Sequence, residues 1–290
     1  MNATNLFHAR NDLGESACWF AERNSFFWTD ITASVIYEIE LSTSKVTKRN
    51  VAGMVSLILP ESKNTALLLM QDGIYRYFFA TDITEKLMEV EAAITNNRTN
   101  DGDVDSTGRV WFGTMDNNCR KEAGSFYSAD TISGLQHKLS NMTIPNGIAW
   151  TADNRIMYHV ESARNEVRAW NFDSITGDIH FKETVIKVPS ELGSPDGMCM
   201  DTEGMLWIAH YGGFGVYRWN PETGLLMDKI SLPVPQPTSC AFGGENMDRL
   251  LITTAKQELT TEQLTLYPES GDIFIVTPGC TGMVKHRAKL

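Results

Sequence analysis

Four polar side chains occupy one recurring position along the chain, just ahead of a series of acidic turns. They are Glu15, Asn100, Asn146 and Asp196. Each lies 5 to 7 residues before the acidic turn that follows it. Two carboxylates and two amide oxygens brought together would form a hard oxygen site, which suits Ca²⁺, Mg²⁺ or Mn²⁺ and is also accepted by Zn²⁺ and Fe²⁺.

The same residues have an ordinary explanation as turns. Asp101-Gly102, Asn146-Gly147 and Asp196-Gly197 are dipeptides of the kind that turns favour, because both residue types tolerate positive φ. Taken singly, each pair fits a turn better than a binding site. Their shared phase within a repeat favours an ion site.

The acidic turns reveal an internal repeat. Asp105, Asp153 and Asp201 are each separated by 48 residues (153 − 105 = 48; 201 − 153 = 48), and each precedes a short apolar segment containing an aromatic residue. We expect these three aspartates to cap hairpin turns far from the site, and we assign them no chemistry. Further copies of the pattern lie at residues 22–28, 60–69 and 246–252.

Each repeat unit reads as a set of short strands. The first unit predicts strands at residues 17–20, 26–30, 35–40 and 45–50. Residues 84–94 carry apolar residues at helical spacing, but the repeat favours strand and turn there. Four strands in each of six units predict an all-β fold, a six-bladed β-propeller that forms a single domain over residues 1–290. A two-domain β protein is disfavoured because no Pro-, Gly- or Ser-rich linker interrupts the repeat.

Composition narrows the class of protein. The chain is 42% hydrophobic and 10% aromatic, which excludes disorder, and its net charge of −11 argues against nucleic acid or an anionic membrane as a partner. Residues 1–10 lack the pattern of a secretory signal, and no apolar run approaches the roughly 20 residues that span a bilayer. We therefore expect a cytoplasmic protein, monomeric or weakly oligomeric.

The remaining chemical motifs are absent or explained by packing. The five cysteines are scattered and form no CxxC, so we expect reduced thiols, with Cys18, Cys199 and Cys240 in the core. There is no Gly-x-Ser-x-Gly, no HExxH and no phosphate-binding glycine loop. His210 is the one histidine expected near the site, and a core or surface role fits it better than a catalytic one.

Several motifs together carry a family resemblance. They are Leu13-Gly-Glu-Ser-Ala-Cys-Trp19, Arg98-Thr-Asn-Asp-Gly102, Gly108-Arg-Val-Trp-Phe-Gly-Thr-Met115, Pro145-Asn-Gly-Ile148 and Pro195-Asp-Gly-Met198. In this order and spacing the chain resembles the regucalcin/gluconolactonase (senescence marker protein) family from about residue 13 to 274. Residues 96–100 and 211–216 look most like its bacterial sugar-acid lactonase branch. The resemblance implies a propeller that hydrolyses sugar-acid lactones with one divalent metal ion.

The resemblance also implies roles for individual residues. Glu15, Asn146 and Asp196 correspond to direct metal ligands, and Asp196 also to the general base. Asn100 sits where the family contacts metal or substrate, and Arg98 where it binds sugar hydroxyls.

Two positions depart from the family. Ala17 replaces a proline that stiffens the approach to the first strand. The acid that some animal members carry on a lid after Gly-Thr-Met has no clear counterpart, with Asp116 and Glu122 as weak candidates.

The sequence therefore predicts a metal-dependent hydrolase that opens aldonolactones such as glucono-, xylono- or arabinonolactone. The metal ion would act as Lewis acid and Asp196 as general base. Two alternatives stay open: an esterase or organophosphate hydrolase of the related propellers, and a non-catalytic propeller that binds metal or a partner. Arg98 favours the lactonase, because an anchor for sugar oxygens has no purpose with an apolar ester.

Overall fold

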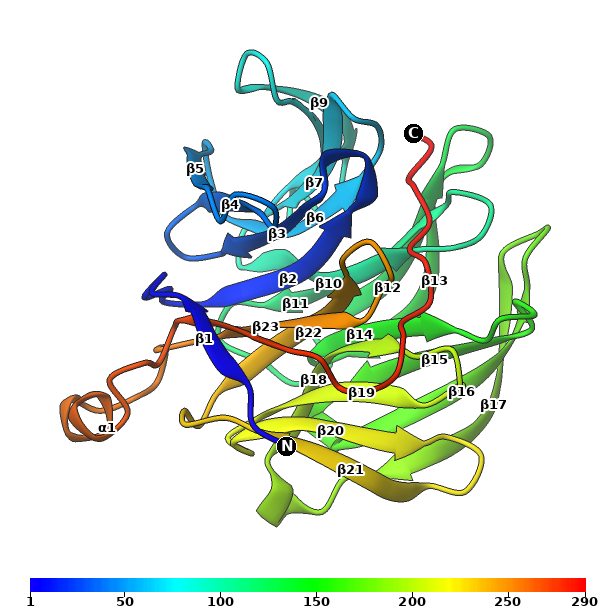
Figure 1. Cartoon of the computed structure of the whole chain (residues 1–290). Helices are drawn as coiled ribbons and strands as arrows, with labels where there is room; N and C mark the ends of the chain where they lie inside the picture. The colour runs from blue at the N-terminus through cyan, green and yellow to red at the C-terminus, as the bar shows by residue number, and fades with distance from the viewer.

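Each repeat folds into one four-stranded antiparallel sheet, and six such sheets surround a common axis in the computed structural model of residues 1–290 (Figure 1). This confirms the predicted six-bladed propeller. From the axis outward the first five sheets are β2 (Gly14–Phe20), β3 (Ser25–Asp30), β4 (Val35–Glu40), β5 (Val46–Asn50); β6 (Val55–Pro60), β7 (Thr65–Met70), β8 (Gly73–Phe78), β9 (Ile83–Glu89); β10 (Asn97–Val104), β11 (Val110–Asp116), β12 (Gly124–Asp130), β13 (Gly134–Met142); β14 (Pro145–Trp150), β15 (Ile156–Glu161), β16 (Glu166–Asp173), β17 (Asp178–Lys187); and β18 (Ser194–Met200), β19 (Leu206–Tyr211), β20 (Gly215–Asn220), β21 (Leu225–Ser231).

The sixth sheet closes the ring with strands from both ends of the chain. It consists of β22 (Pro237–Gly243), β23 (Arg249–Thr254), β24 (Ile273–Val276) and the N-terminal strand β1 (Thr4–Phe7). β1 pairs antiparallel with β24, with Thr4 opposite Ile275. The repeat pattern did not reveal this closure, because the sixth unit has only three strands of its own.

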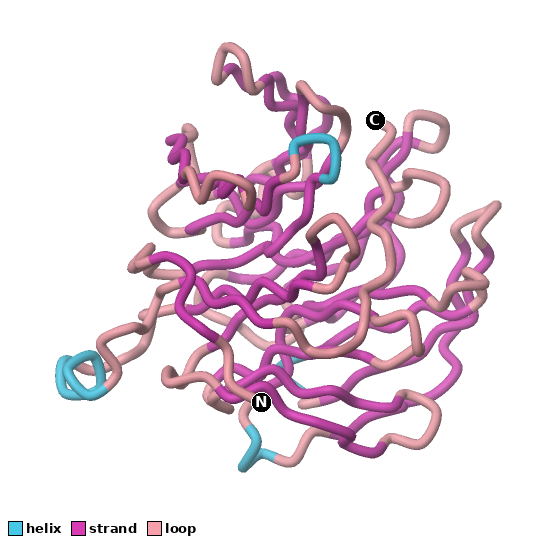
Figure 2. The backbone as a smooth tube through the Cα atoms, viewed as in Figure 1, coloured by secondary structure: helices cyan, strands magenta, loops and turns pink.

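Little of the chain is helical (Figure 2). The segment with ambiguous periodicity forms strand β9, as the repeat predicted. The one α-helix, α1 (Thr261–Leu266), stands out from the body of the molecule between β23 and β24 and begins with a capping box at Thr260 (Figure 1). The short 3₁₀ turns are η1 (Ala21–Arg23), η2 (Ser162–Arg164) and η3 (Ser190–Leu192). None of these helices has the length and apolar character that a membrane crossing needs.

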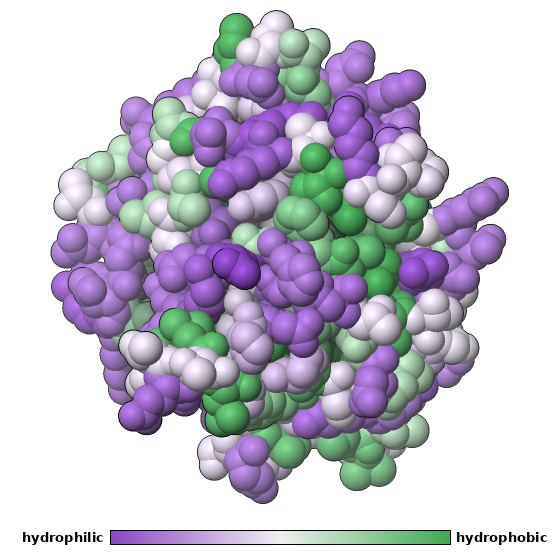
Figure 3. Space-filling view, turned by 60° about the vertical axis from the view of Figure 1, so that its left-hand side comes forward, coloured by the Kyte–Doolittle hydropathy of each residue, from purple (hydrophilic) through white to green (hydrophobic).

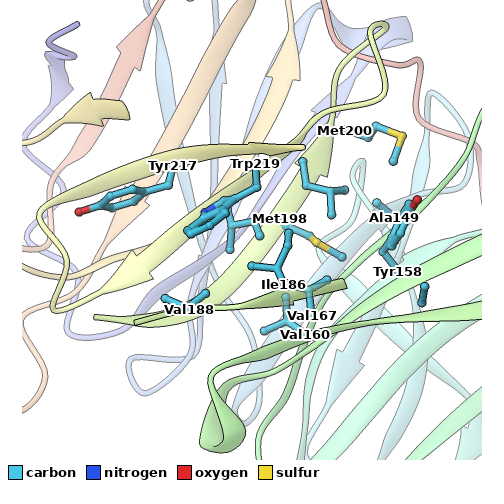
Figure 4. Packing of buried hydrophobic residues seen from close by; sticks show 13 residues of the cluster. Ala149, Tyr158, Val160, Val167, Ile186, Val188, Met198, Met200, Tyr217 and Trp219 are labelled. Atoms are coloured by element: carbon cyan, nitrogen blue, oxygen red, sulfur yellow. The ribbon is translucent and has the colours of Figure 1, made fainter. Parts of the chain in front are cut away.

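The hydrophobic core lies between neighbouring sheets. Figure 4 shows the contact of the fourth and fifth sheets, where Val160 and Val167 face Met198 and Trp219. All four side chains are buried. The fourth sheet also packs against the third on its other face, and the exposed side chains gather on outermost strands such as β5, β9 and β21. The face in Figure 3 is covered mostly by hydrophilic side chains with smaller hydrophobic patches between them.

The three repeated aspartates cap their turns, as expected, and Asp105 and Asp201 also bond to tryptophans of the core. Asp105 Oδ1 accepts hydrogen bonds from the backbone N–H groups of Thr107 (2.8 Å) and Arg109 (3.1 Å), and its Oδ2 accepts one from Trp111 Nε1 (2.9 Å). Asp201 binds Trp207 Nε1 in the same way at 2.9 Å. In the third and fifth sheets the aspartate and the tryptophan therefore form one structural unit.

The last residues of the chain cross the end of the axis opposite the polar residues (Figure 1). We call residues 277–290 the C-terminal strap. Its backbone N–H groups donate to carbonyls of the sixth, fifth, second and third sheets, namely those of Met247, Met200, Pro60 and Gly108. The side chain of Lys285 enters the axial space and forms an ion pair with Asp103 on β10. The strap thereby links the fifth and sixth sheets to the second and third sheets.

Replacing Lys285 by methionine should destabilise the fold. Asp103 is 7% exposed, so it would keep a buried charge without its partner, at a cost of about 3 kcal/mol. Urea unfolding followed by circular dichroism measures this. Lys289→Met, on the same strap but without an ion pair, should change stability little, and Lys285→Met combined with Asp103→Asn should recover part of the loss. Equal effects of Lys285→Met and Lys289→Met would contradict a stabilising ion pair.

Candidate metal centre and active site

The polar residues predicted for the site sit on irregular steps in the innermost strands. Each of the six inner strands loses register with its neighbour at the same end of the axis. In β2 the shift falls between Glu15 and Cys18, and in β14 between Asn146 and Ile148. A bulge turns a side chain away from the regular alternation. The shared position explains why residues of one sequence phase meet at one point.

The turn explanation is wrong for all three glycine dipeptides. Asp101-Gly102 lies inside β10, Asn146-Gly147 inside β14 and Asp196-Gly197 inside β18. None of the three glycines has a positive φ. A Cβ at Gly147 would lie 2.8 Å from the carbonyl oxygen of Asp196, so glycine is needed there because adjacent inner strands approach closely.

All five predicted site residues line one cavity of about 250 Å³. Glu15, Asn100, Asn146 and Asp196 are each at least 90% buried, and Arg98 is partly buried. Side chains from four different sheets, predicted to meet from their shared position in the repeat, therefore line the same cavity.

Hydrogen bonds fix the two amides. Asn100 Nδ2 donates to Asn146 Oδ1 at 3.2 Å and to the carbonyl of Pro145 at 2.9 Å. Asn146 Nδ2 donates to Ser162 Oγ at 2.9 Å, and that hydroxyl donates to the carbonyl of Pro195 at 2.6 Å. Arg98 Nη1 donates to Asn100 Oδ1 at 2.5 Å. Both polar atoms of the Asn100 amide thus bond to protein groups, and the amide oxygens of Asn100 and Asn146 each accept one hydrogen bond and retain one lone pair.

The carboxylates are crowded. Burial, followed by the charges of Asp196 and Asp101, raises the pKa of Glu15 well above its usual range. Burial and the charge of Asp101 raise the pKa of Asp196 in the same way. Asp101 lines the narrow axial space below the cavity, where burial raises its pKa to about 6. Arg98 is the cation that opposes the charges of both Glu15 and Asp196.

These residues fit a divalent cation. Asp196 Oδ1 is buried without a hydrogen-bond partner, and Glu15 accepts only a long bond of 3.4 Å from the Ser16 N–H. Leaving such an oxygen unpaired is costly, and a cation would satisfy it. The donor set consists of oxygen alone, which matches the hard-cation expectation.

A second acidic group, at the outer edge of the sixth sheet, fits a cation less well. His8, Glu269 and Asp272 bring potential ligand atoms within 4.8 Å of one another. Asn5 Nδ2 donates to both carboxylates, at 2.7 and 2.9 Å, and His8 Nδ1 lies 2.7 Å from Asp272 Oδ2. These oxygens already have partners on the protein.

The structure also identifies residues that the motifs did not assign to the site. Tyr211, Glu258 and Cys119 line the cavity, whereas the two weak candidates for a lid acid, Asp116 and Glu122, do not. Glu258 lies in the loop between β23 and α1, which has no counterpart in the other repeat units, so its position could not be predicted from the repeat.

His210 belongs to the core. It is fully buried, its ring stacks on Tyr217 with centroids 4.1 Å apart, and Trp219 Nε1 donates to its Nε2 at 3.3 Å. Nδ1 must then carry the proton that it shares with the carbonyl of Leu192 at 3.0 Å. Burial lowers the pKa of His210 to about 4, which keeps the ring neutral.

Residues 13–256 match the family described as SMP-30/Gluconolactonase/LRE-like region. The chain belongs to this family. Human regucalcin is 34% identical over 278 residues, covering 91% of this chain and 90% of its own length. A protein of Bacillus subtilis named putative sugar lactone lactonase is 28% identical over 274 residues, covering 94% of each chain. These identities do not decide between the animal and bacterial branches.

Among solved structures, a calcium-binding protein, regucalcin, from Agrobacterium tumefaciens superposes with a TM-score of 0.95 at 26% identity, covering 100% of this chain and 98% of that one. The whole SMP-30/gluconolactonase fold is therefore present here, including the ring of inner strands that carries the cavity.

A divalent cation should stabilise the protein against heat. Binding to the folded state at 100 times the dissociation constant adds about 2.7 kcal/mol. We expect the melting temperature to rise with Ca²⁺, Mg²⁺, Mn²⁺ or Zn²⁺ and to fall back when EDTA is added. Asp196→Asn and Glu15→Gln should abolish the rise, while Asp153→Asn, in an exposed turn of the fourth sheet, should retain it. A cation response that survives both site substitutions would place the ion elsewhere.

Proposed function

We propose that the protein is a metal-dependent lactonase that opens sugar-acid lactones to aldonic acids. The observation that carries this proposal is the buried, unpaired Asp196 Oδ1 within a convergent set of oxygen donors. Membership of the gluconolactonase family and the similarity to a named sugar lactone lactonase support the substrate class.

We further propose that Glu15, Asn146 and Asp196 hold one divalent cation. Their free oxygens and mutual repulsion favour a positive charge between them. The similarity to a regucalcin described as calcium-binding supports Ca²⁺, and the all-oxygen donor set also admits Mg²⁺, Mn²⁺, Zn²⁺ or Fe²⁺.

A lactone is a cyclic ester, so opening it requires a polarised carbonyl and an activated water. The bound cation would supply Lewis-acid polarisation of the carbonyl. Asp196 would accept the proton of the attacking water, a role for which it is suited because its carboxylate lines the same cavity as the other proposed cation ligands and would hold the water in place. Arg98 would donate to hydroxyl or ring oxygens and balance the negative charge that develops as the ring opens.

Arg98 also argues against an apolar ester as substrate. Its guanidinium lines the cavity, and burial lowers its pKa. An apolar ester would leave the remaining N–H groups without acceptors, which is costly for a buried cation. A hydroxyl-rich ring satisfies them.

The proposal is tested by acid release from a panel of aldonolactones with each of Ca²⁺, Mg²⁺, Mn²⁺, Zn²⁺ and Fe²⁺. Hydrolysis should require the ion and stop with chelator. Asp196→Asn should lower kcat by about 10²–10⁴-fold, because both a ligand and the base are lost. Asp153→Asn serves as the matched acidic control and should retain activity.

Two results would reject the lactonase. One is hydrolysis that chelator does not affect. The other is the absence of hydrolysis with every lactone and every ion, which would leave a non-catalytic metal-binding propeller as the better explanation.

A further inference from the structure

The rim of the cavity carries a carboxylate that the proposed chemistry does not use. Glu258 lies on the loop between β23 and α1, is exposed, and lines the cavity together with Glu15 and Asp196. Burial raises the pKa of the nearby Cys119 thiol, and the charges of Arg98 and Glu258 act on that thiol in opposite directions. Arg98 and Glu258 therefore lie around one opening.

The loop that carries Glu258 is held on both sides. The backbone N–H groups of Lys256 and Gln257 both donate to the carbonyl of Asp12, at 3.0 and 2.9 Å. On the other side, Thr260 and Gln263 form the reciprocal bonds of the capping box, at 2.9 and 3.2 Å. The rim loop thus has a defined position relative to the first sheet, which carries Glu15.

Glu258 itself has a strained backbone. Its φ is +66°, in the left-handed region that favours glycine. The bonds of Lys256, Gln257 and Thr260 hold it there.

Tyr211 contacts this rim carboxylate and is also affected by the charges of the buried ones. Its hydroxyl lies 3.1 Å from the carbonyl oxygen of Gln257 and 3.3 Å from Glu258 Oε2. Burial raises the pKa of the Tyr211 phenol, with further contributions from the charges of Glu258, Asp196 and Glu15. The phenol therefore stays protonated and orients Glu258, whose Oε1 has no donor on the protein.

We propose that Glu258 is a specificity residue that accepts a hydrogen bond from a hydroxyl at the end of the lactone remote from its carbonyl. This inference rests on the lactonase proposal. Arg98 can only donate, and both polar atoms of the Asn100 amide are already bonded to the protein. Glu258 adds the anionic acceptor that a polyhydroxylated lactone can use and an unsubstituted lactone cannot.

The experiment compares a polyhydroxylated six-membered lactone, glucono-1,5-lactone, with unsubstituted δ-valerolactone. For Glu258→Ala we expect kcat/KM to fall about tenfold on the hydroxylated lactone, mainly through KM, and to stay within about twofold on δ-valerolactone. Where turnover of δ-valerolactone is too slow to follow, it is used instead as an inhibitor of glucono-1,5-lactone hydrolysis, and its inhibition constant is compared between the variants. Glu258→Gln keeps an acceptor oxygen, so its kcat/KM on the hydroxylated lactone should fall less than that of Glu258→Ala.

Control variants separate specificity from structure. Glu262→Ala removes an exposed carboxylate from α1 and should leave kcat/KM unchanged on both lactones. Circular dichroism with thermal melting checks the fold of each variant. Tyr211→Phe should show the same selective loss at smaller size, because the carboxylate remains but is no longer oriented.

Three results would overturn the inference: no loss for Glu258→Ala, an equal loss on both lactones, or a selective loss for Glu122→Ala in its place. Failure of the wild-type protein to open either lactone with any of the divalent ions would instead overturn the lactonase proposal.

Discussion

The site depends on one constraint, the closure of six inner strands around a single axis. Strands that meet in a ring must approach closely at their ends, which is why Gly147 has no room for a side chain beside the Asp196 carbonyl. The same closure forces the bulged residues of different sheets toward one point. Carboxylates that are far apart in sequence, such as Glu15 and Asp196, are thereby buried together.

That burial has an electrostatic cost, which the structure offsets at several levels. Arg98 opposes Glu15 and Asp196 within the cavity, and Lys285 of the C-terminal strap neutralises Asp103 further along the axis. Neither cation reaches Asp196 Oδ1, which remains unpaired. A divalent ion would complete the balance, so the repulsion among these carboxylates and their affinity for a cation have the same physical origin.

The regular part of the molecule could be predicted from the sequence, because residues at the same position of each repeat unit occupy equivalent places around the axis of a closed ring. The 48-residue spacing predicted six sheets and indicated which of many polar residues would meet at the axis. Local patterns were weaker evidence. Asn146-Gly147 looks like a turn by composition, and only the neighbouring strand, supplied by Asp196 and Met198, explains the glycine. The closing strand β1 has four residues and no repeat partner in its own segment, so its pairing with β24 could be seen only in three dimensions.

The same difference between repeat and loop separates the inner-strand residues of the cavity from Glu258 on its rim. Glu15, Asn146 and Asp196 lie on inner strands, where any displacement would disturb neighbouring sheets, so their geometry is tied to the stability of the ring. Glu258 lies on a loop outside the repeat, anchored by backbone hydrogen bonds to Asp12 rather than by core packing. A loop of this kind can vary in length and sequence without altering the inner strands. The propeller can therefore keep its ring of inner strands while the rim of the cavity changes, and residues on such a rim loop are the ones a repeat-based prediction is least able to find.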